Sequence, residues 1–370
     1  YWRHFMNRTE NTKRLLEHNN PETVGSYEHF WGETIPEWVK QGYPVVEDEN
    51  GNKVPKRINE VFDYDIVSCG AWVKGYPKLT EEVVEETDRW YIIRNGAGAV
   101  MRLMKGASST PEHIGFDIDC EEKWLEYKPY YLGLNKDRID EKSIKAEYDY
   151  AKNKGLFTVL PNVSVFETLR SHIGDVCMCE NLLLDPDWIE DLCNTYTDML
   201  ILHYDYIFKN IVKPDAMWIY EDMGYNKGLL CSPRTMRAHI YPYHKKLLDY
   251  FKSQDLLTFL HSCGNITEGI PDFIESGFVC LNPMEVKAGC DLVEFAKKFK
   301  DKLAFCGGMD IRIMETNDRD LIKKEMDRLF GEIKNIGAMW FFGSDHSISP
   351  KVKYDTYRFI MDYYLENREY

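Results

Sequence analysis

Three observations on the sequence predict an α/β protein of the (β/α)8 (TIM) barrel class. From about residue 155 onward, short apolar runs alternate with longer stretches of helical periodicity, which is typical of parallel β/α units. The short runs lack polar alternation, as expected of strands that are buried on both faces. Neither GxGxxG nor GxxxxGK[ST] follows any of them, so a nucleotide-binding doubly wound sheet lacks its motif.

Six strands are clear, and an apolar run identifies each of them. They are expected at residues 155–163, 216–222, 256–263, 278–286, 302–310 and 338–346. A further strand near Ile66–Val67 or Ile114–Phe116 would bring the total towards eight. A closed barrel therefore fits better than an open sheet.

Helices are predicted between these strands. Asp185-Pro186 opens one, because Asp is a favourable N-cap and Pro suits the first helical turn. Ser232-Pro233 opens another, which Pro242 is expected to kink. The remaining helices are expected at about residues 10–18, 271–276, 317–333 and 354–365, and one more starts at Asp291.

The first part of the chain is irregular and rich in Trp and Tyr. Residues 1–110 are predicted to be an N-terminal elaboration of a single domain that spans residues 1–370, with most of the barrel in 111–370. Asn95-Gly96 within WYIIRNGAGAVMRLMKG predicts a β-hairpin in this extension. No Pro/Ser-rich linker marks a separate domain.

Composition narrows the classes of function. The chain has 370 residues, of which 44% are hydrophobic, and a net charge of −15, which disfavours nucleic-acid binding because phosphates need a basic surface. No run approaches the ~18 apolar residues of a membrane span, and the N-terminus lacks the apolar core of a signal peptide. The 10 cysteines show no disulfide spacing, so a cytoplasmic protein is expected.

Polar residues stand at the C-terminal tips of five predicted strands. Active sites of (β/α)8 barrels lie at this face and use such residues from several strands. If the barrel closes, these side chains converge on one cavity, and we expect Asn282, Asp310 and Asp345 to contact the substrate. The tips carry Glu221 and Asp222, His261 and Cys263, Asn282 and Glu285, Asp310, and Asp345 and His346.

His261 and Cys263 form a His-x-Cys pair at the end of one strand. Residues two apart on a strand point the same way, and an imidazole with a thiolate favours zinc. Other strands must supply the remaining ligands, and Glu285 and His346 are the best donors. The alternative is that His261 is a hydrogen-bonded polar residue and Cys263 fills the core.

Two other strand tips have open interpretations. His346, in GSDHSISP, is a metal ligand or a general acid, or belongs to a turn that caps the next helix. Glu221 and Asp222 contact the substrate, or pair structurally with Arg234 or Lys227.

Six segments, in order along nearly the whole chain, resemble the uroporphyrinogen decarboxylase-like superfamily. The resemblance implies a (β/α)8 barrel with an N-terminal extension, and a homodimer, because members are often dimeric. The segments are RTENTKRLLEHNNPE with FWGETIPEW, EDMGYNKGLLCSP, HSCGNI, NPMEVKAGCDL, LAFCGGMD and SDHSISPKVKYDTYRFI.

Two chemistries occur in this superfamily. Its decarboxylases use no metal and bind tetrapyrrole carboxylates with arginines of a W-x-M-R-Q-A-G-R-like stretch, where this chain has EHFWGETIPEW. Its corrinoid-dependent methyltransferases hold zinc with His-x-Cys and a later Cys. His261 and Cys263 match the first part, and His346 stands where the late Cys is expected. The related cobalamin-independent methionine synthases add a Glu on the next strand, at a position similar to Glu285.

The resemblance therefore implies a zinc-dependent methyltransferase that acts between a corrinoid and a small methylated molecule or thiol. His346 would be catalytic as well as a ligand, and Glu221 and Asp222 would have a catalytic role by orienting the substrate or the groups around the metal ligands. An imidazole in place of a second thiolate makes zinc a stronger Lewis acid, which favours demethylation of the substrate. The chain lacks Asp-x-His-x-x-Gly, so a separate corrinoid protein is expected as partner. The alternative is a metal-free carboxy-lyase that uses His346 as proton donor.

Overall fold

A computed structural model describes residues 6–70, 72–106 and 111–370, and its centre is an eight-stranded parallel sheet. The strands follow one another around the sheet in chain order, and every neighbouring pair is parallel. They are β1 (Gly25–Ser26), β4 (Ile66–Ser68), β9 (Phe157–Val163), β10 (Ala216–Tyr220), β13 (Leu257–His261), β14 (Cys280–Asn282), β15 (Ala304–Cys306) and β16 (Trp340–Phe342).

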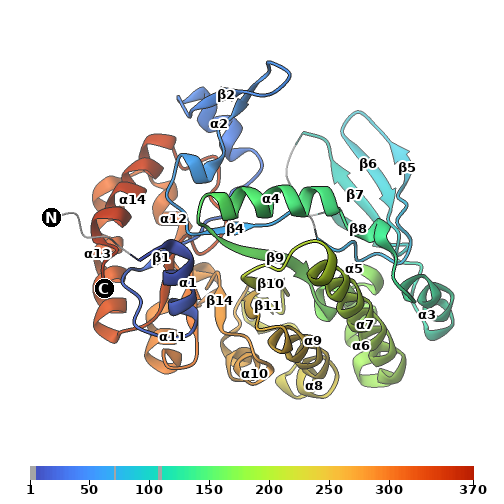
Figure 1. Cartoon of the computed structure of the whole chain (residues 1–370). Helices are drawn as coiled ribbons and strands as arrows, with labels where there is room; N and C mark the ends of the chain where they lie inside the picture. The colour runs from blue at the N-terminus through green and yellow to red at the C-terminus, as the bar shows by residue number, and fades with distance from the viewer. Residues whose placement is uncertain (1–5, 71, 107–110) are drawn as a thin grey trace.

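Asp65 closes the gap between the first and second strands of this sheet. Its backbone N–H donates to the Ser26 carbonyl at 3.2 Å, and its carboxylate accepts the Ser26 N–H at 2.8 Å. The sheet is thereby a nearly closed barrel, and the predicted (β/α)8 class is confirmed (Figure 1). All six strands that the apolar runs predict are present, and Ile66 belongs to the seventh.

Helices surround the barrel, as Figure 1 shows. Ser232 caps the predicted helix after β10 by accepting the Thr235 N–H, and this helix ends at His239 and restarts at Tyr241, one residue before Pro242. The α-helices are α1 (Arg8–Leu16), α2 (Thr34–Lys40), α3 (Glu121–Tyr127), α4 (Glu141–Asn153), α5 (Val165–Ile173), α6 (Asp175–Leu184), α7 (Pro186–Asn210), α8 (Pro233–His239), α9 (Tyr241–Ser253), α10 (Ile270–Ser276), α11 (Leu292–Phe299), α12 (Ile311–Glu315), α13 (Arg319–Ile336) and α14 (Tyr354–Asn367).

Short 3-10 helices lie in the connections. They are η1 (Ile58–Glu60), η2 (Lys128–Tyr131), η3 (Lys136–Arg138), η4 (Thr267–Gly269) and η5 (Val286–Ala288).

The extension adds small antiparallel sheets to the barrel. The predicted hairpin is present as β6 and β7, and Asn95 Oδ1 holds its turn by accepting the N–H groups of Ala97 and Ala99. Residues 1–110 also supply β1 and β4 to the barrel itself. Its added strands are β2 (Val45–Glu47), β3 (Lys53–Pro55), β5 (Glu82–Glu86), β6 (Trp90–Arg94) and β7 (Val100–Met104), and β8 (Glu112–Gly115), just after the extension, completes the sheet of β5 to β7. A separate small hairpin, β11 (Gly224–Tyr225) and β12 (Gly228–Leu229), follows β10.

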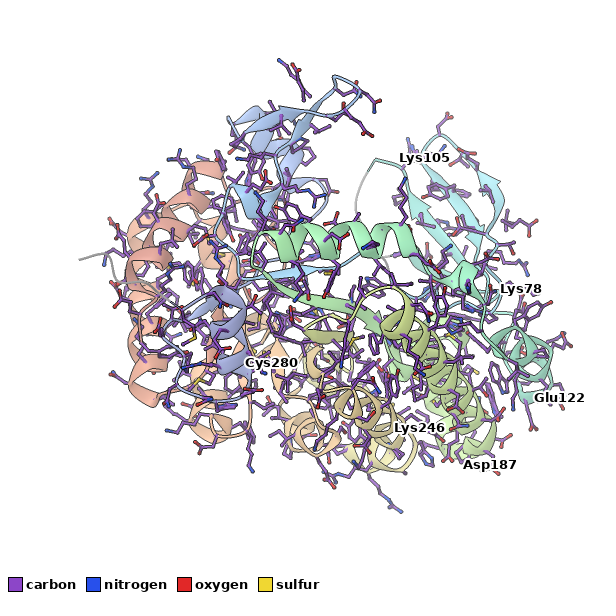
Figure 2. The ribbon with its side chains drawn as sticks, viewed as in Figure 1. Lys78, Lys105, Glu122, Asp187, Lys246 and Cys280 are labelled. Atoms are coloured by element: carbon purple, nitrogen blue, oxygen red, sulfur yellow. The ribbon has the colours of Figure 1, made fainter. Side chains whose placement is uncertain are left out.

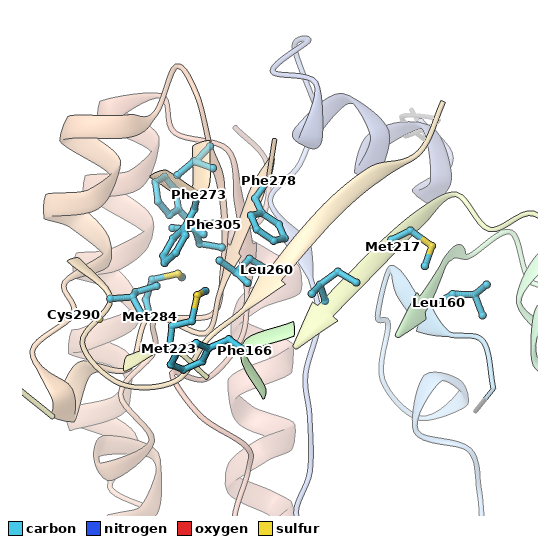
Figure 3. Close-up of a cluster of buried hydrophobic side chains, with 14 of the residues drawn as sticks. Leu160, Phe166, Met217, Met223, Leu260, Phe273, Phe278, Met284, Cys290 and Phe305 are labelled. Carbon is cyan, nitrogen blue, oxygen red and sulfur yellow. The ribbon is translucent and has the colours of Figure 1, made fainter. Parts of the chain in front are cut away.

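Side-chain alternation along the barrel strands separates two apolar cores. Met217 and Leu260 point outward and pack against the helices, together with residues such as Phe273 (Figure 3). Trp218 and Phe259 belong to the inner core and stack with ring centroids 4.6 Å apart. Because this inner layer fills the barrel, only the residues beyond it at the C-terminal strand ends can line a site.

The outer surface carries many charged side chains. Charged side chains such as Glu122 on α3 and Asp187 on α7 lie at the periphery (Figure 2). Among the described helices, none has both the length and the apolar character needed to span a bilayer.

Candidate metal centre

Strand register places three polar residues side by side above the inner apolar layer. Tyr220 pairs with His261 across β10 and β13, and His261 pairs with Asn282 across β13 and β14. Each stands two residues beyond an inner-core position on its strand, so all three point to the barrel axis. Parallel pairing thus builds one layer of functional groups at the mouth.

Asn282 fixes the orientation of the His261 ring. Asn282 Nδ2 donates to the Cys306 carbonyl at 2.9 Å, which turns its Oδ1 towards His261 Nδ1, 2.6 Å away. An amide oxygen can only accept, so the tautomer that fits this contact carries its hydrogen on Nδ1. The lone pair is then on Nε2, where it is free to bind a metal.

Two further potential ligand atoms lie close to this Nε2 atom. Cys263 Sγ lies 3.4 Å from it and Asp222 Oδ1 lies 3.8 Å from it. All three atoms lie within 4.8 Å of one another. Ligand bonds of ~2.0–2.3 Å around a tetrahedral zinc give ligand-to-ligand separations of roughly 3.3–3.8 Å, so the spacing is close to that of a bound site.

The loop after β13 is held by its neighbours. Asp222 Oδ1 accepts the Cys263 N–H at 2.9 Å, and Glu285 Oε2 accepts the Gly264 N–H at 2.7 Å. Gly264 has φ +82°, and a side chain there would meet the backbone of Gly224 at 2.3 Å. Carboxylates that follow the two strands flanking β13, together with one glycine, therefore fix the position of the thiol.

Charge favours a cation at this cluster. Burial raises the pKa of the Cys263 thiol well above its ordinary value, and the carboxylates of Asp222 and Glu285 raise it further. Lys287, a cation beside these groups, pairs with Glu285 Oε1 at 3.0 Å. Sulfur, imidazole nitrogen and carboxylate oxygen are the donor types that zinc accepts. The residues present therefore fit a zinc ion.

A cavity of about 130 Å³ opens at the cluster. Its lining residues stand on strand ends or loops that lie far apart in the sequence. Besides His261, Cys263 and Asn282, the lining comprises Tyr27, Glu28, His29, Tyr220, Pro283, Ser344, His346 and Ser347.

His346 lines this cavity but lies outside the three-residue cluster. Its ring stacks on Trp31 at a centroid distance of 5.7 Å. Burial lowers the pKa of His346, and the nearby Lys287 ammonium lowers it further. The imidazole is consequently neutral at pH 7, a form that suits a ligand better than a proton donor.

The predicted ligand Glu285 is engaged elsewhere in the described structure. Its two oxygens accept from the Gly264 amide and Lys287, and it is nearly buried. Its carboxylate thus shapes the Cys263 loop, and its role as a ligand stays a prediction, as does that of His346.

Three other predicted site residues hold structural elements together. Glu221 is fully buried and accepts the N–H groups of Phe166 and Glu167 at the start of α5, at 3.0 and 2.6 Å. Asp310 caps α12. Asp345 accepts the N–H groups of Val286 and Ile311 at 2.8 and 2.7 Å. None of these three carboxylates lines the cavity.

The segment after β1 supplies cavity residues that the sequence did not reveal. Tyr27, Glu28 and His29 line the cavity, and Trp31 supports His346. The available signal is the polar and aromatic run YEHFW directly after Gly25-Ser26. A two-residue strand without an apolar run gives no sequence pattern. The strand before YEHFW could therefore not be predicted, and neither could the position of these residues at its C-terminal end.

Comparisons with known proteins address the fold and the family. A model of the uroporphyrinogen decarboxylase (URO-D) family matches residues 177–366. A solved "methyltransferase from Methanosarcina mazei" is similar with a TM-score of 0.64 and 15% identity, over 98% of this chain and 99% of that chain. This likeness concerns the fold alone.

A solved Xaa-Pro dipeptidase with bound methionine gives a TM-score of only 0.30, at 11% identity over 60% of this chain and 56% of that chain. Among curated proteins, no match was found. The family model spans half of the chain, including β10 and all later barrel strands with the His-x-Cys loop. The chain therefore belongs to the uroporphyrinogen decarboxylase (URO-D) family.

Proposed function

We propose that this protein is a zinc-dependent methyltransferase that moves a methyl group between a small methylated molecule or thiol and a corrinoid on a partner protein. The observation that carries the proposal is the cluster of Asp222, His261 and Cys263 at the mouth of the barrel. The similar fold of a solved methyltransferase adds support.

The chain's own residues would hold the metal and shape its surroundings. His261 Nε2, Cys263 Sγ and Asp222 Oδ1 are proposed as ligands, with His346 or Glu285 as the predicted fourth. Bound zinc would act as a Lewis acid towards a thiol or a methylated atom. Asn282 orients the His261 ring, and Glu285 fixes the loop of Cys263 through the Gly264 amide.

Cavity size favours a small substrate. A volume of about 130 Å³ is similar to the ~150 Å³ apolar cavity that holds one benzene molecule. A tetrapyrrole is far larger, and its carboxylates need cations. The described lining of the cavity includes neither arginine nor lysine, which argues against a decarboxylase with such a substrate.

The metal-free carboxy-lyase is a weaker candidate for a second reason. It requires His346 to donate a proton, but burial lowers the pKa of this imidazole. Near neutral pH the ring would lack the proton to donate.

A corrinoid protein is proposed to dock over the cavity mouth. Two half-exposed tryptophans flank the cavity residues: Trp31 stacks on His346 and Trp72 stacks on Tyr220, with centroids 5.7 and 5.0 Å apart. Exposed aromatic side chains are frequent anchors of protein interfaces. Mixing with such a protein is expected to give a complex detectable by size-exclusion chromatography.

Metal analysis tests the proposal. The wild type, dialysed against zinc without chelator, should bind one zinc ion per chain, and Cys263→Ser should lose it. Asp222→Asn and His346→Ala then identify the third ligand. Cys177→Ser, a half-buried thiol on α6, is the matched control and should retain zinc. A wild type without zinc, or a Cys263→Ser variant that retains it, would refute the proposed centre.

A further inference from the structure

The cavity wall beside the metal cluster is aromatic and carries a carboxyl group. Tyr27 and Tyr220 line it together with Glu28. The Tyr27 ring packs on Trp218 at 4.4 Å, and the Tyr220 ring packs on Trp72 at 5.0 Å. Neighbouring indoles therefore hold both phenol rings in place, and an aromatic face held near a cavity attracts cations.

Glu28 has hydrogen-bond donors but no cation. Its carboxylate accepts the Ser344 N–H at 2.9 Å, the Ser344 hydroxyl at 2.7 Å and the His29 N–H at 3.0 Å. No ion pair to Glu28 is present within residues 6–70, 72–106 and 111–370. Burial raises the pKa of Glu28 to about 8. A carboxyl group in such a place is stable as the neutral acid or beside a positive charge.

Positive charge is missing from the rest of this cavity. Its described lining has no lysine or arginine, and burial lowers the pKa of His29, so that imidazole is neutral at pH 7. Lys287 is held by Glu285 and does not line the cavity. A carboxylate or sulfonate on the substrate would consequently find no partner here.

We propose that the substrate is a small thiol, or its methyl thioether, whose other end carries an amine cation received by Tyr27, Glu28 and Tyr220. This inference rests on the proposed function, which places the sulfur at the cluster of Asp222, His261 and Cys263. The cavity of about 130 Å³ accommodates a molecule of roughly five or six non-hydrogen atoms, by comparison with a cavity that holds benzene.

Three two-carbon thiols test the charge. Cysteamine carries an ammonium and 2-mercaptoethanol a hydroxyl, so these two differ in little but charge. The third, 2-mercaptoethanesulfonate, carries a negative sulfonate and is also larger. Isothermal titration calorimetry on the zinc-loaded protein should give cysteamine a Kd about tenfold or more below that of 2-mercaptoethanol, with the sulfonate weakest, because a hydrogen bond to a charged group is stronger than a neutral one.

Glu28→Gln should abolish the preference for cysteamine over 2-mercaptoethanol while leaving the affinity for 2-mercaptoethanol within about twofold. Glutamine imitates the neutral acid that burial already favours at this position, so the variant is expected to fold. Glu37→Gln removes an exposed carboxylate on α2 that pairs with Lys40, and this control should keep the wild-type order.

The outcomes separate this inference from the proposed function. Equal affinities for the three thiols, or tightest binding of the sulfonate, would overturn the charge preference and leave zinc-dependent thiol binding in place. A preference that survives in Glu28→Gln would also overturn it. Failure to bind zinc would refute the proposed function, and the inference that rests on it.

Discussion

His261 Nδ1 and Asn282 Oδ1 lie 2.6 Å apart in one layer of the barrel, and this contact decides which nitrogen of His261 faces the candidate centre. A ring without this partner can rotate or adopt the other tautomer. Partners that orient a metal-binding histidine typically contribute 10- to 100-fold to metal affinity.

Asn282→Ala is therefore expected to lower zinc affinity by about 10- to 100-fold. Asn282→Asp keeps an oxygen acceptor for Nδ1 and should lose less than Asn282→Ala. Competition with a chromophoric chelator measures both. Asn194→Ala, on the exposed face of α7, is the control. Unchanged affinity in a folded Asn282→Ala protein would show that the ring needs no such partner.

The contacts of Glu221 indicate that it stabilises the fold. Its neighbour in the chain, Asp222, belongs instead to the candidate metal cluster. Its buried carboxylate accepts two N–H groups of α5 and lies 2.8 Å from His244 Nε2. Removing it leaves several buried polar groups unpaired, so Glu221→Ala should lower the free energy of unfolding by about 2–4 kcal/mol. Urea denaturation measures this change.

Zinc affinity of the folded Glu221→Ala protein should stay within about threefold of the wild type, because no contact joins this carboxylate to the cluster. The folded fraction of the variant could instead lose zinc or methyl transfer. That result would support the catalytic role that the position of Glu221 at a strand tip indicates.

The strand tips were predictable because parallel strands bring their carboxyl ends to one face. Strand alternation could also have separated Asp222 from Glu221: Trp218 and Tyr220 face the interior, so Asp222 lies on their side and Glu221 on the other. That alternation explains why Asp222 joins His261 and Cys263 in the structure.

Other features of the site needed tertiary structure. Strand β1 has two residues and is defined by its pairing with β16 and by Asp65, neither of which leaves a local pattern. Glu28 and Trp31 consequently fall within the predicted N-terminal elaboration, although they reach the cavity and His346. Short strands that depend on partners distant in sequence escape periodicity arguments.

The pKa of Glu28 predicts a pH-dependent stability. Burial raises this pKa from 4.5 to about 8, so the folded protein keeps the proton over a range in which the unfolded chain has lost it. The sign follows from linkage: the contribution of Glu28 to stability is full below about pH 4.5, falls as the pH rises, and is lowest above about pH 8.

The Glu28→Gln variant has no titratable carboxyl group at this position. Relative to the wild type, it should gain on the order of 1–2 kcal/mol of unfolding free energy between about pH 5 and pH 9, a value reduced for partial solvent exposure of the carboxyl. Chemical denaturation at both pH values measures the difference. A difference that does not change with pH would mean that Glu28 ionises normally in the folded protein.

Gly264 is the point at which backbone geometry controls the candidate centre. Its φ of +82° suits glycine, and an added Cβ would lie 2.3–2.5 Å from backbone atoms of Gly224 and Tyr225. Gly337, at the end of α13, has a similar φ of +71° with no atom within 4 Å of an added Cβ. The two positions separate the cost of the backbone angle from the cost of the clash.

Gly337→Ala should lower the free energy of unfolding by about 1–2 kcal/mol, the typical cost of a left-handed non-glycine residue, and leave zinc affinity unchanged. Gly264→Ala should cost more and weaken zinc binding, because the backbone that carries Cys263 must move away from the segment that follows Asp222. Denaturation and zinc competition on both variants measure these effects. Equal stability losses with intact zinc affinity would show that the loop accommodates the methyl group without moving Cys263.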